Sequence, residues 1–167
     1  MIDFFPEEHK QFSEKKRFGI CDTPPPPACK AYIDEKNGKD WIATVDNYYQ
    51  ELVTFIPVDN CIEINKPDGT MDNRCDGFLY YKATIIFVEL KQRNVKGNKW
   101  IKEGEKQLRE TIGHFEKEPQ SKSFSVKKAY IANRHRPYFR SSQAIRMDEF
   151  FNDTRYSLRI ENRICID

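Results

Sequence analysis

Two carboxylates and a lysine are the side chains of this sequence best placed to do chemistry. Asp76 opens the segment 76–94, Glu89 follows it by 13 residues, and Lys91 comes two positions later. Two carboxylates can hold a hard divalent cation through oxygen ligands, and a neighbouring ammonium can orient an attacking water or a phosphate. The pattern therefore indicates the hydrolysis of a phosphodiester bond.

The segment that carries these residues is predicted to be a β-hairpin, with strands at 76–81 and 84–91 and a turn near Lys82. Because strand side chains alternate with period two, Glu89 and Lys91 leave the same face of the second strand. An isolated buried charge costs several kcal/mol, so this strand end should face a cleft, a partner or a metal. Both faces of the second strand are apolar, as in the centre of a sheet, through Ile85 and Phe87 on one side and Ile86, Val88 and Leu90 on the other.

This arrangement resembles the PD-(D/E)XK nuclease superfamily, in which an Asp on one strand of a hairpin precedes Glu-x-Lys on the next. Asp76 and Glu89-Leu90-Lys91 match that motif, while Cys75 stands where the motif has its proline. The resemblance implies an α/β (α+β) protein with a restriction-endonuclease-like αβββαβ core, in which helices flank a central mixed sheet.

The resemblance also implies a role for each site residue. Asp76, Glu89 and the carbonyl of Leu90 would bind Mg²⁺ or Mn²⁺, and Lys91 would orient the attacking water. Glu51, on a first helix, would complete the metal shell, or it is an ordinary solvated glutamate. Gln107, on the next helix, would lie near the metal, although the related enzymes usually place a Tyr where this chain has Thr111.

Helical periodicity appears twice. A first helix is predicted from Asp40, as its N-cap, to Thr54, and a second from Trp100 to Lys117. His114 in the second helix is either a surface histidine or a base. The apolar stripe of the first helix consists of Trp41, Val45, Tyr48, Tyr49 and Leu52, and that of the second of Ile101, Leu108, Ile112 and Phe115.

Further strands complete the expected core. Residues 61–64 should pair with the strand at Asp76 across the turn Pro67-Asp68-Gly69, which has strong turn chemistry. A strand at 126–132, a helix at 142–151 and a strand at 157–165 are predicted to follow. The expected organisation is one nuclease-like domain over 1–167, made of an N-terminal extension with a proline-rich connector (1–39), the core (40–132) and a C-terminal helix and strand (133–167).

Composition narrows the class of protein. The 167 residues are 32% charged and 38% hydrophobic, which is typical of one soluble globular domain. The apolar runs are too short to span a bilayer, and the N-terminus does not resemble a signal peptide, so we expect a cytoplasmic protein without membrane contact. Five scattered cysteines and three dispersed histidines argue against a zinc site. Phosphate-binding glycine motifs are also absent from the sequence, which argues against a nucleotide-binding fold.

A basic region indicates which class of molecule the protein binds. Residues 121–147 contain seven basic side chains and no acidic one, and aromatic residues are interleaved with them. Such a region suits nucleic acid, although a solvated strand edge would have the same composition. The side chains expected to contact nucleic acid are Arg93, Lys96, Lys99, Arg134 and Arg136.

The sequence thus predicts a metal-dependent nuclease, with DNA favoured over RNA as its substrate. Three alternatives stay open: a catalytically inactive nucleic-acid-binding or protein-interaction module on the same fold, a purely structural ion pair between Glu89 and Lys91, and an enzyme acting on a small phosphodiester. Endonuclease or exonuclease action, and assembly as a homodimer or with a partner subunit, are not decided by the sequence.

Overall fold

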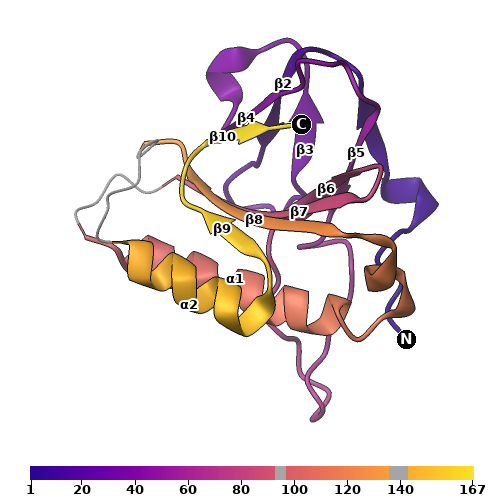
Figure 1. Ribbon diagram of the computed structural model, residues 1–167, viewed down its shortest axis with the longest axis vertical. Coiled ribbons are helices and arrows are strands. Elements are labelled where there is room, and N and C mark those ends of the chain that lie inside the picture. Colours follow the sequence, from indigo (N-terminus) through magenta and orange to yellow (C-terminus); the bar gives the residue numbers. More distant parts are fainter. Residues whose placement is uncertain (93–96, 136–142) are drawn as a thin grey trace.

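The computed structural model describes residues 1–92, 97–135 and 143–167 of a mixed α/β protein. Within these residues two α-helices, a six-stranded sheet and a four-stranded sheet form three layers (Figure 1). The six-stranded sheet lies in the middle, so it is covered on both faces.

The central sheet has the strand order β1-β5-β6-β7-β8-β9. Its strands β5, β6 and β7 are antiparallel neighbours, whereas β7, β8 and β9 run parallel to one another. The strand predicted at 84–91 is confirmed as β7, all of whose residues are buried. The bounds are β1 Gln11–Ser13, β5 Val53–Pro57, β6 Gly77–Tyr81, β7 Thr84–Lys91, β8 Val126–Asn133 and β9 Ser157–Arg159.

The second sheet has the order β10-β4-β2-β3 and packs against the face of the central sheet that the helices leave open (Figure 1). Residues 1–39, expected as an extension, supply one strand to the central sheet and two to this one. The bounds are β2 Arg17–Cys21, β3 Tyr32–Asp34, β4 Ala43–Asp46 and β10 Arg163–Cys165.

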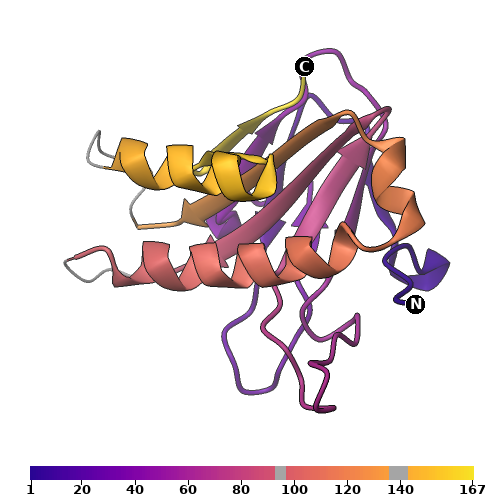
Figure 2. The ribbon, with the colours of Figure 1, turned by 60° about the horizontal axis from the view of Figure 1, so that its bottom comes forward.

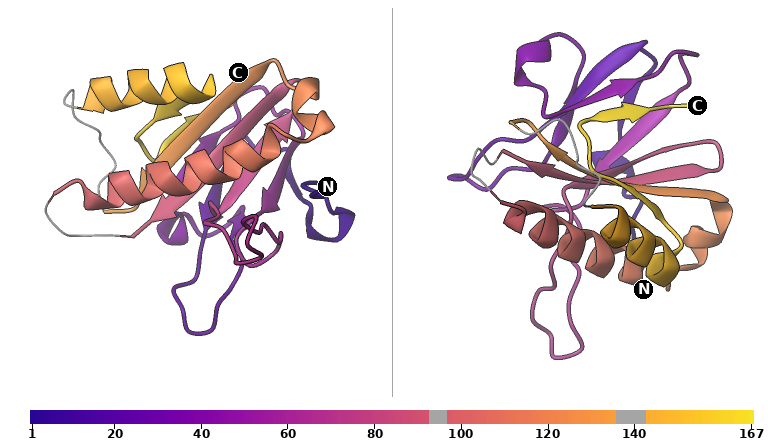
Figure 3. Two further views of the ribbon diagram at one scale, coloured as in Figure 1. Left: turned by 90° about the horizontal axis from the view of Figure 1, so that it is seen from below. Right: turned by 60° about the vertical axis from the view of Figure 1, so that its left-hand side comes forward.

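Two α-helices in the described part of the chain cover the other face of the central sheet, as Figures 2 and 3 show. The helix α1, Lys99–Phe115, confirms the second predicted helix, and its stripe from Ile101 to Phe115 is buried. The helix α2, Ala144–Thr154, lies beside β9. Short 3₁₀ turns occur at η1 Glu7–His9, η2 Gly38–Asp40 and η3 Pro119–Ser123. Neither α1 nor α2 has the length and apolarity needed to cross a membrane, and no other helix among the described residues does.

The strand β7 divides the core in two, as its alternating side chains predict. Ile85 and Phe87 belong to the cluster under the helices, which also contains Leu108 and Phe115. On the opposite face of β7, its even-numbered apolar side chains belong to the cluster between the two sheets, and these are Ile86, Val88 and Leu90.

The helix predicted from Asp40 to Thr54 is wrong. The strands β4 and β5 occupy this stretch, and three residues of the supposed apolar stripe are exposed, namely Tyr48 (74%), Tyr49 (71%) and Leu52 (54%). The β-branched residues at 42–45 and 53–56 favour strands, which pack them better than helices do. Between the strands, the Asn47 side chain bonds the Glu51 main chain twice, at 2.8 and 3.0 Å, and closes a loop.

The prediction that residues 61–64 pair with the strand at Asp76 is also wrong. The strand β6 pairs with β5. Residues 61–64 belong instead to a long loop, in which the described residues form one isolated β-bridge, between Asn65 and Met71. The five fully buried residues of β5 give it the larger apolar surface, so it takes the place beside β6. The predicted Pro67-Asp68-Gly69 turn is present at the tip, with Gly69 at φ +88°.

The last predicted strand, 157–165, is divided. Its first part, β9, extends the central sheet, and its second part, β10, pairs with β4 in the other sheet. The two apolar halves of the segment therefore serve different cores, with Leu158 in one and Ile164 in the other.

Candidate active site

The candidate site lies where β6 begins and β7 ends. Antiparallel pairing sets Gly77 opposite Val88, which brings Asp76 next to Glu89. Glu89 Oε1 accepts the main-chain N–H of Asp76 at 3.2 Å, and Asp76 Oδ2 accepts the main-chain N–H of Leu90 at 2.6 Å. Both carboxylates are thus fixed to the backbone of the neighbouring strand.

Lys91 joins these carboxylates to α1. Its Nζ lies 3.0 Å from Glu89 Oε2 and donates a hydrogen bond to Gln107 Oε1 at 2.9 Å. The amide nitrogen of Gln107 in turn donates to the Arg74 carbonyl at 3.5 Å. The structure therefore brings together Asp76, Glu89, Lys91 and Gln107, which the sequence had predicted as one site.

Burial disfavours the charged forms of the two carboxylates at this site. Glu89 is 2% exposed, and burial raises its pKa to about 6 although the Lys91 ammonium opposes the shift. Burial, together with the Glu89 charge, raises the pKa of Asp76 well above its usual range. Two carboxylates in a region of low dielectric repel each other, so a cation held between them would stabilise their charged forms.

Two glycines allow the close packing around the site. A Cβ at Gly77 would lie 2.5 Å from the Phe55 ring and 2.8 Å from the Ile56 carbonyl oxygen. A Cβ at Gly104 would lie 3.3 Å from Glu89 Cγ, and Ile131 would be as close. Gly104 therefore lets α1 approach β7 at Glu89, which sets Gln107 within reach of Lys91.

Asp22 is a third carboxylate at the site that the sequence did not reveal. It follows β2 of the second sheet, and its carboxyl is close enough to that of Asp76 for the two charges to interact. Burial, followed by the charge of Asp76, raises the pKa of Asp22 to about 7. Its main-chain carbonyl also accepts a hydrogen bond from Gln92 at 3.4 Å. No local motif marks Asp22, because its position depends on how the two sheets pack.

The residue Thr111 positions the chain just before Asp76. Its Oγ1 accepts the main-chain N–H of Cys75 at 2.9 Å, and both residues are buried. One turn further along α1, His114 Nε2 lies 2.8 Å from Asp72 Oδ2. Burial opposes the charge of Asp72, but the hydrogen bond with His114 helps to lower its pKa to about 2. The helix thus holds the segment 72–76 along its length.

The structure does not bring Glu51 to the site, so its predicted place in a metal shell is wrong. Glu51 lies 2.9 Å from Lys82, in the turn between β6 and β7. That turn is at the end of β7 opposite to Glu89, about 20 Å away at ~3.3 Å per residue. The reason is that the first helix, which was expected to carry Glu51 over the sheet, does not form.

The residues expected to contact nucleic acid are only partly described. Arg93, Lys96 and Arg136 lie outside the described residues. The main-chain N–H of Arg134 donates to the Lys91 carbonyl at 2.9 Å, and its guanidinium donates to the carbonyl of Lys39. The strands β7 and β8 are parallel, so their C-terminal ends lie side by side. Arg134 therefore lies at the same end of the strands as the candidate site.

Several charges of the basic region 121–147 are neutralised by ion pairs. Lys127 pairs with Glu116 at 2.8 Å and Lys128 with Asp167 at 3.2 Å. Arg146 likewise reaches a glutamate of α1 at 2.5 Å. Among the described residues of this stretch, these pairs favour the interpretation of Lys127, Lys128 and Arg146 as ordinary surface charges.

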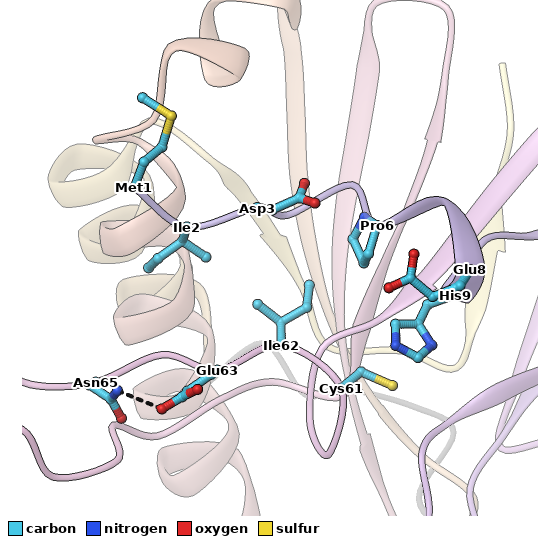
Figure 4. A pocket seen from close by; sticks show the side chains of 10 residues that line it. All are labelled: Met1, Ile2, Asp3, Pro6, Glu8, His9, Cys61, Ile62, Glu63 and Asn65. Atoms are coloured by element: carbon cyan, nitrogen blue, oxygen red, sulfur yellow. Dashed lines mark hydrogen bonds between the residues drawn. The ribbon is translucent and has the colours of Figure 1, made fainter.

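A hollow of about 380 Å³ gives access to Lys91 and Gln107, and its other lining residues are Asn73, Glu103 and Lys106. A separate hollow of about 560 Å³ lies beside the N-terminus, where Asp3, Glu8 and Glu63 face it (Figure 4). None of the predicted site residues lines that second hollow, so access to the candidate site comes from the side of α1.

The donor set fits a hard divalent cation. No group of three or more His, Cys, Asp or Glu side chains in the described part of the chain is arranged to hold an ion by itself. The expected set instead combines Asp76, Glu89 and a main-chain oxygen. Within a strand the N–H and C=O of one residue point to the same side, so the Leu90 carbonyl shares the side on which its N–H reaches Asp76. Mg²⁺ is commonly held by one or two carboxylates and retains several waters.

Comparison of the chain with protein families, with curated proteins and with solved structures finds no match.

Proposed function

We propose that this protein is a metal-dependent nuclease of the PD-(D/E)XK type that hydrolyses phosphodiester bonds of nucleic acid, with DNA as the favoured substrate. The observation that carries the proposal is the buried Lys91 ammonium, which is held between Glu89 and Gln107 beside the carboxylate of Asp76. A lysine, two carboxylates and an amide at one strand end form a constellation suited to phosphodiester hydrolysis.

The chemistry divides among these residues. Asp76, Glu89 and the Leu90 carbonyl would hold Mg²⁺ or Mn²⁺, which supplies a water of lowered pKa when it is bound. An ammonium has three donors, and Lys91 uses two of them on Glu89 and Gln107. The third donor can bond the attacking water or a phosphate oxygen, and so offset charge that develops in the transition state.

The order of elements supports the fold part of the proposal. From β5 to β8 the chain runs through three antiparallel strands, the helix α1 and a strand parallel to β7. This order agrees with the last five elements of an αβββαβ core. The first helix of that core has no counterpart here, and the strand β4 occupies its place in the chain.

A cleavage assay tests the proposal. The purified protein and its Lys91→Ala variant would be incubated with single- and double-stranded DNA and RNA in Mg²⁺, Mn²⁺ or EDTA. We expect cleavage by the wild type that requires the metal and is lost in Lys91→Ala. Lys82→Ala is the matched control, because Lys82 is an exposed lysine at the other end of the same hairpin. Metal-dependent cleavage by Lys91→Ala would overturn the assignment.

One observation favours a second candidate, a binding module that has no catalysis. Glu89 and Lys91 form a close ion pair at 3.0 Å, so each of these buried charges has a partner of opposite sign. A folded protein that binds nucleic acid but neither binds Mn²⁺ in calorimetry nor cleaves any substrate would establish this alternative.

A further inference from the structure

Three lysines line one face of the N-terminal half of α1. Lys99, Lys102 and Lys106 are spaced by three and four residues, which places them on the same side of the helix. All three side chains are exposed, and none forms an ion pair with another residue that the structure describes. We refer to these three residues as the lysine row.

Two of the three acidic side chains of α1 are already engaged with other groups. Glu105 pairs with Arg109 at 2.6 Å and with Arg146 at 2.5 Å. Glu103 is likewise engaged with another group. Glu110, one turn beyond Lys106, is half-buried, and its Oε2 is buried without a hydrogen-bond partner among the described residues. The exposed lysine row therefore offers its positive charges to a ligand, while Glu103 and Glu105 are occupied by other groups.

The lysine row leads to the candidate active site. A hollow of about 820 Å³ along α1 is lined by all three lysines. Lys106 and Glu103 line this hollow and also the smaller one that contains Lys91 and Gln107. The two hollows are thus adjacent, and α1 runs along the surface of the helical layer that covers the central sheet (Figure 2).

We propose that the lysine row binds the phosphate backbone of a nucleic-acid strand and directs that strand to Lys91. This inference rests on the proposed nuclease function and adds the path of the substrate. Lys99 and Lys106 are seven residues apart, about 10 Å along a helix at ~1.5 Å per residue. One strand of a duplex advances ~3.4 Å per nucleotide, so the row spans roughly three phosphates. A ligand of that length is a polymer and not a small phosphodiester.

The test compares two triple variants with the same change in charge. Lys99→Gln/Lys102→Gln/Lys106→Gln removes the row, and Lys66→Gln/Lys117→Gln/Lys122→Gln removes three other exposed lysines. Binding of fluorescent single- and double-stranded oligonucleotides would be measured by anisotropy in EDTA at several salt concentrations, so that neither metal nor cleavage contributes. Circular dichroism would check that both variants keep the wild-type fold.

We expect the row variant to bind at least about tenfold more weakly than the control, with a salt dependence reduced by roughly two to three ions. Equal affinity and equal salt dependence of the two variants would overturn the inference, and so would a wild type that binds no oligonucleotide. Cleavage separates this inference from the proposed function. If Lys91-dependent cleavage persists while both variants bind alike, the lysine row fails and the nuclease stands. If the wild type cleaves nothing while only the row variant loses binding, the nuclease fails and the row stands.

Discussion

Asp76 and Glu89 are held in place by each other's strands. The Glu89 carboxylate accepts the main-chain N–H of Asp76 at 3.2 Å, and the Asp76 carboxylate accepts that of Leu90, the residue after Glu89, at 2.6 Å. Because main-chain groups of a central sheet move little, these bonds fix both carboxylates before any ion binds. Such preorganisation favours a ligand site over an incidental pair of buried acids.

The first prediction concerns Asp76→Asn. Burial, together with the Glu89 charge, raises the pKa of Asp76 well above its usual range, so a neutral amide removes a buried charge that this site disfavours and should cost little stability. The amide oxygen can still accept the Leu90 N–H. We expect a melting temperature in EDTA close to that of the wild type, and Mn²⁺ affinity lowered at least about tenfold in calorimetry. Unchanged Mn²⁺ affinity would remove Asp76 from the metal site.

The second prediction compares the same substitution at two glycines of α1. Gly113→Ala should stabilise the protein by roughly 0.5–1 kcal/mol, because alanine is the better helix former and no atom lies within 4 Å of the new Cβ. At Gly104 the new Cβ would lie 3.3 Å from Glu89 Cγ, so the helix or Glu89 must shift. We expect Gly104→Ala to be about 1–3 kcal/mol less stable than Gly113→Ala in urea unfolding.

The same pair of variants tests whether α1 must lie close to Glu89 for function. A shift of α1 would move Gln107 away from Lys91, so cleavage should decrease in Gly104→Ala and persist in Gly113→Ala. Equal stability and equal cleavage of the two variants would show that the contact at Gly104 has no consequence.

The parts of the fold that the sequence predicts well are those with a pattern of their own. Both faces of β7 are apolar, and α1 repeats Ile101, Leu108 and Ile112 at helical spacing, so each element is defined by local residues. Glu89 and Lys91 follow from β7 because strand alternation alone sets them on one face.

The parts that failed depend on contacts between distant segments. Between residues 40 and 54 a helical spacing of apolar side chains coincides with two short strands, and partners in other strands decide the outcome. Asp22 reaches Asp76 only because β2 lies in a second sheet packed on the first. The residues around Asp22 form no sequence pattern from which this packing could be predicted. The sequence therefore led us to expect the third carboxylate at Glu51.

The third prediction concerns Thr111→Val. Valine has nearly the same shape as threonine but cannot accept the buried main-chain N–H of Cys75, which Thr111 Oγ1 accepts at 2.9 Å. An unsatisfied buried donor costs about 1–3 kcal/mol, so Thr111→Val should lower the unfolding free energy by that amount. Thr111→Ser keeps the acceptor and is the control.

Thr111→Val should also slow cleavage relative to Thr111→Ser, since Cys75 precedes Asp76 in the chain. If the two variants have the same stability and the same activity, the hydrogen bond to Cys75 does not position the site.

The last prediction concerns pH. The folded-state pKa of Glu89 is raised to about 6 and that of Asp22 to about 7, above ordinary values of about 4.3 and about 3.9. Between these limits the folded chain binds more protons than the unfolded chain. In EDTA these groups should therefore lower the stability of the protein progressively as the pH rises from about 4 to about 7. Asp22→Asn removes one of the two groups, so its melting temperature should decrease less over this range.

Mn²⁺ should reverse this trend, because an ion that binds the carboxylates competes with their protons. Its affinity should rise as the pH increases through about 6 to about 7, where Glu89 and Asp22 lose their protons. Melting curves with and without Mn²⁺ should then diverge towards higher pH, since a ligand that binds only the folded state stabilises it more as its affinity rises. A constant separation of the two curves from pH ~5 to ~8 would mean that Glu89 does not hold the ion.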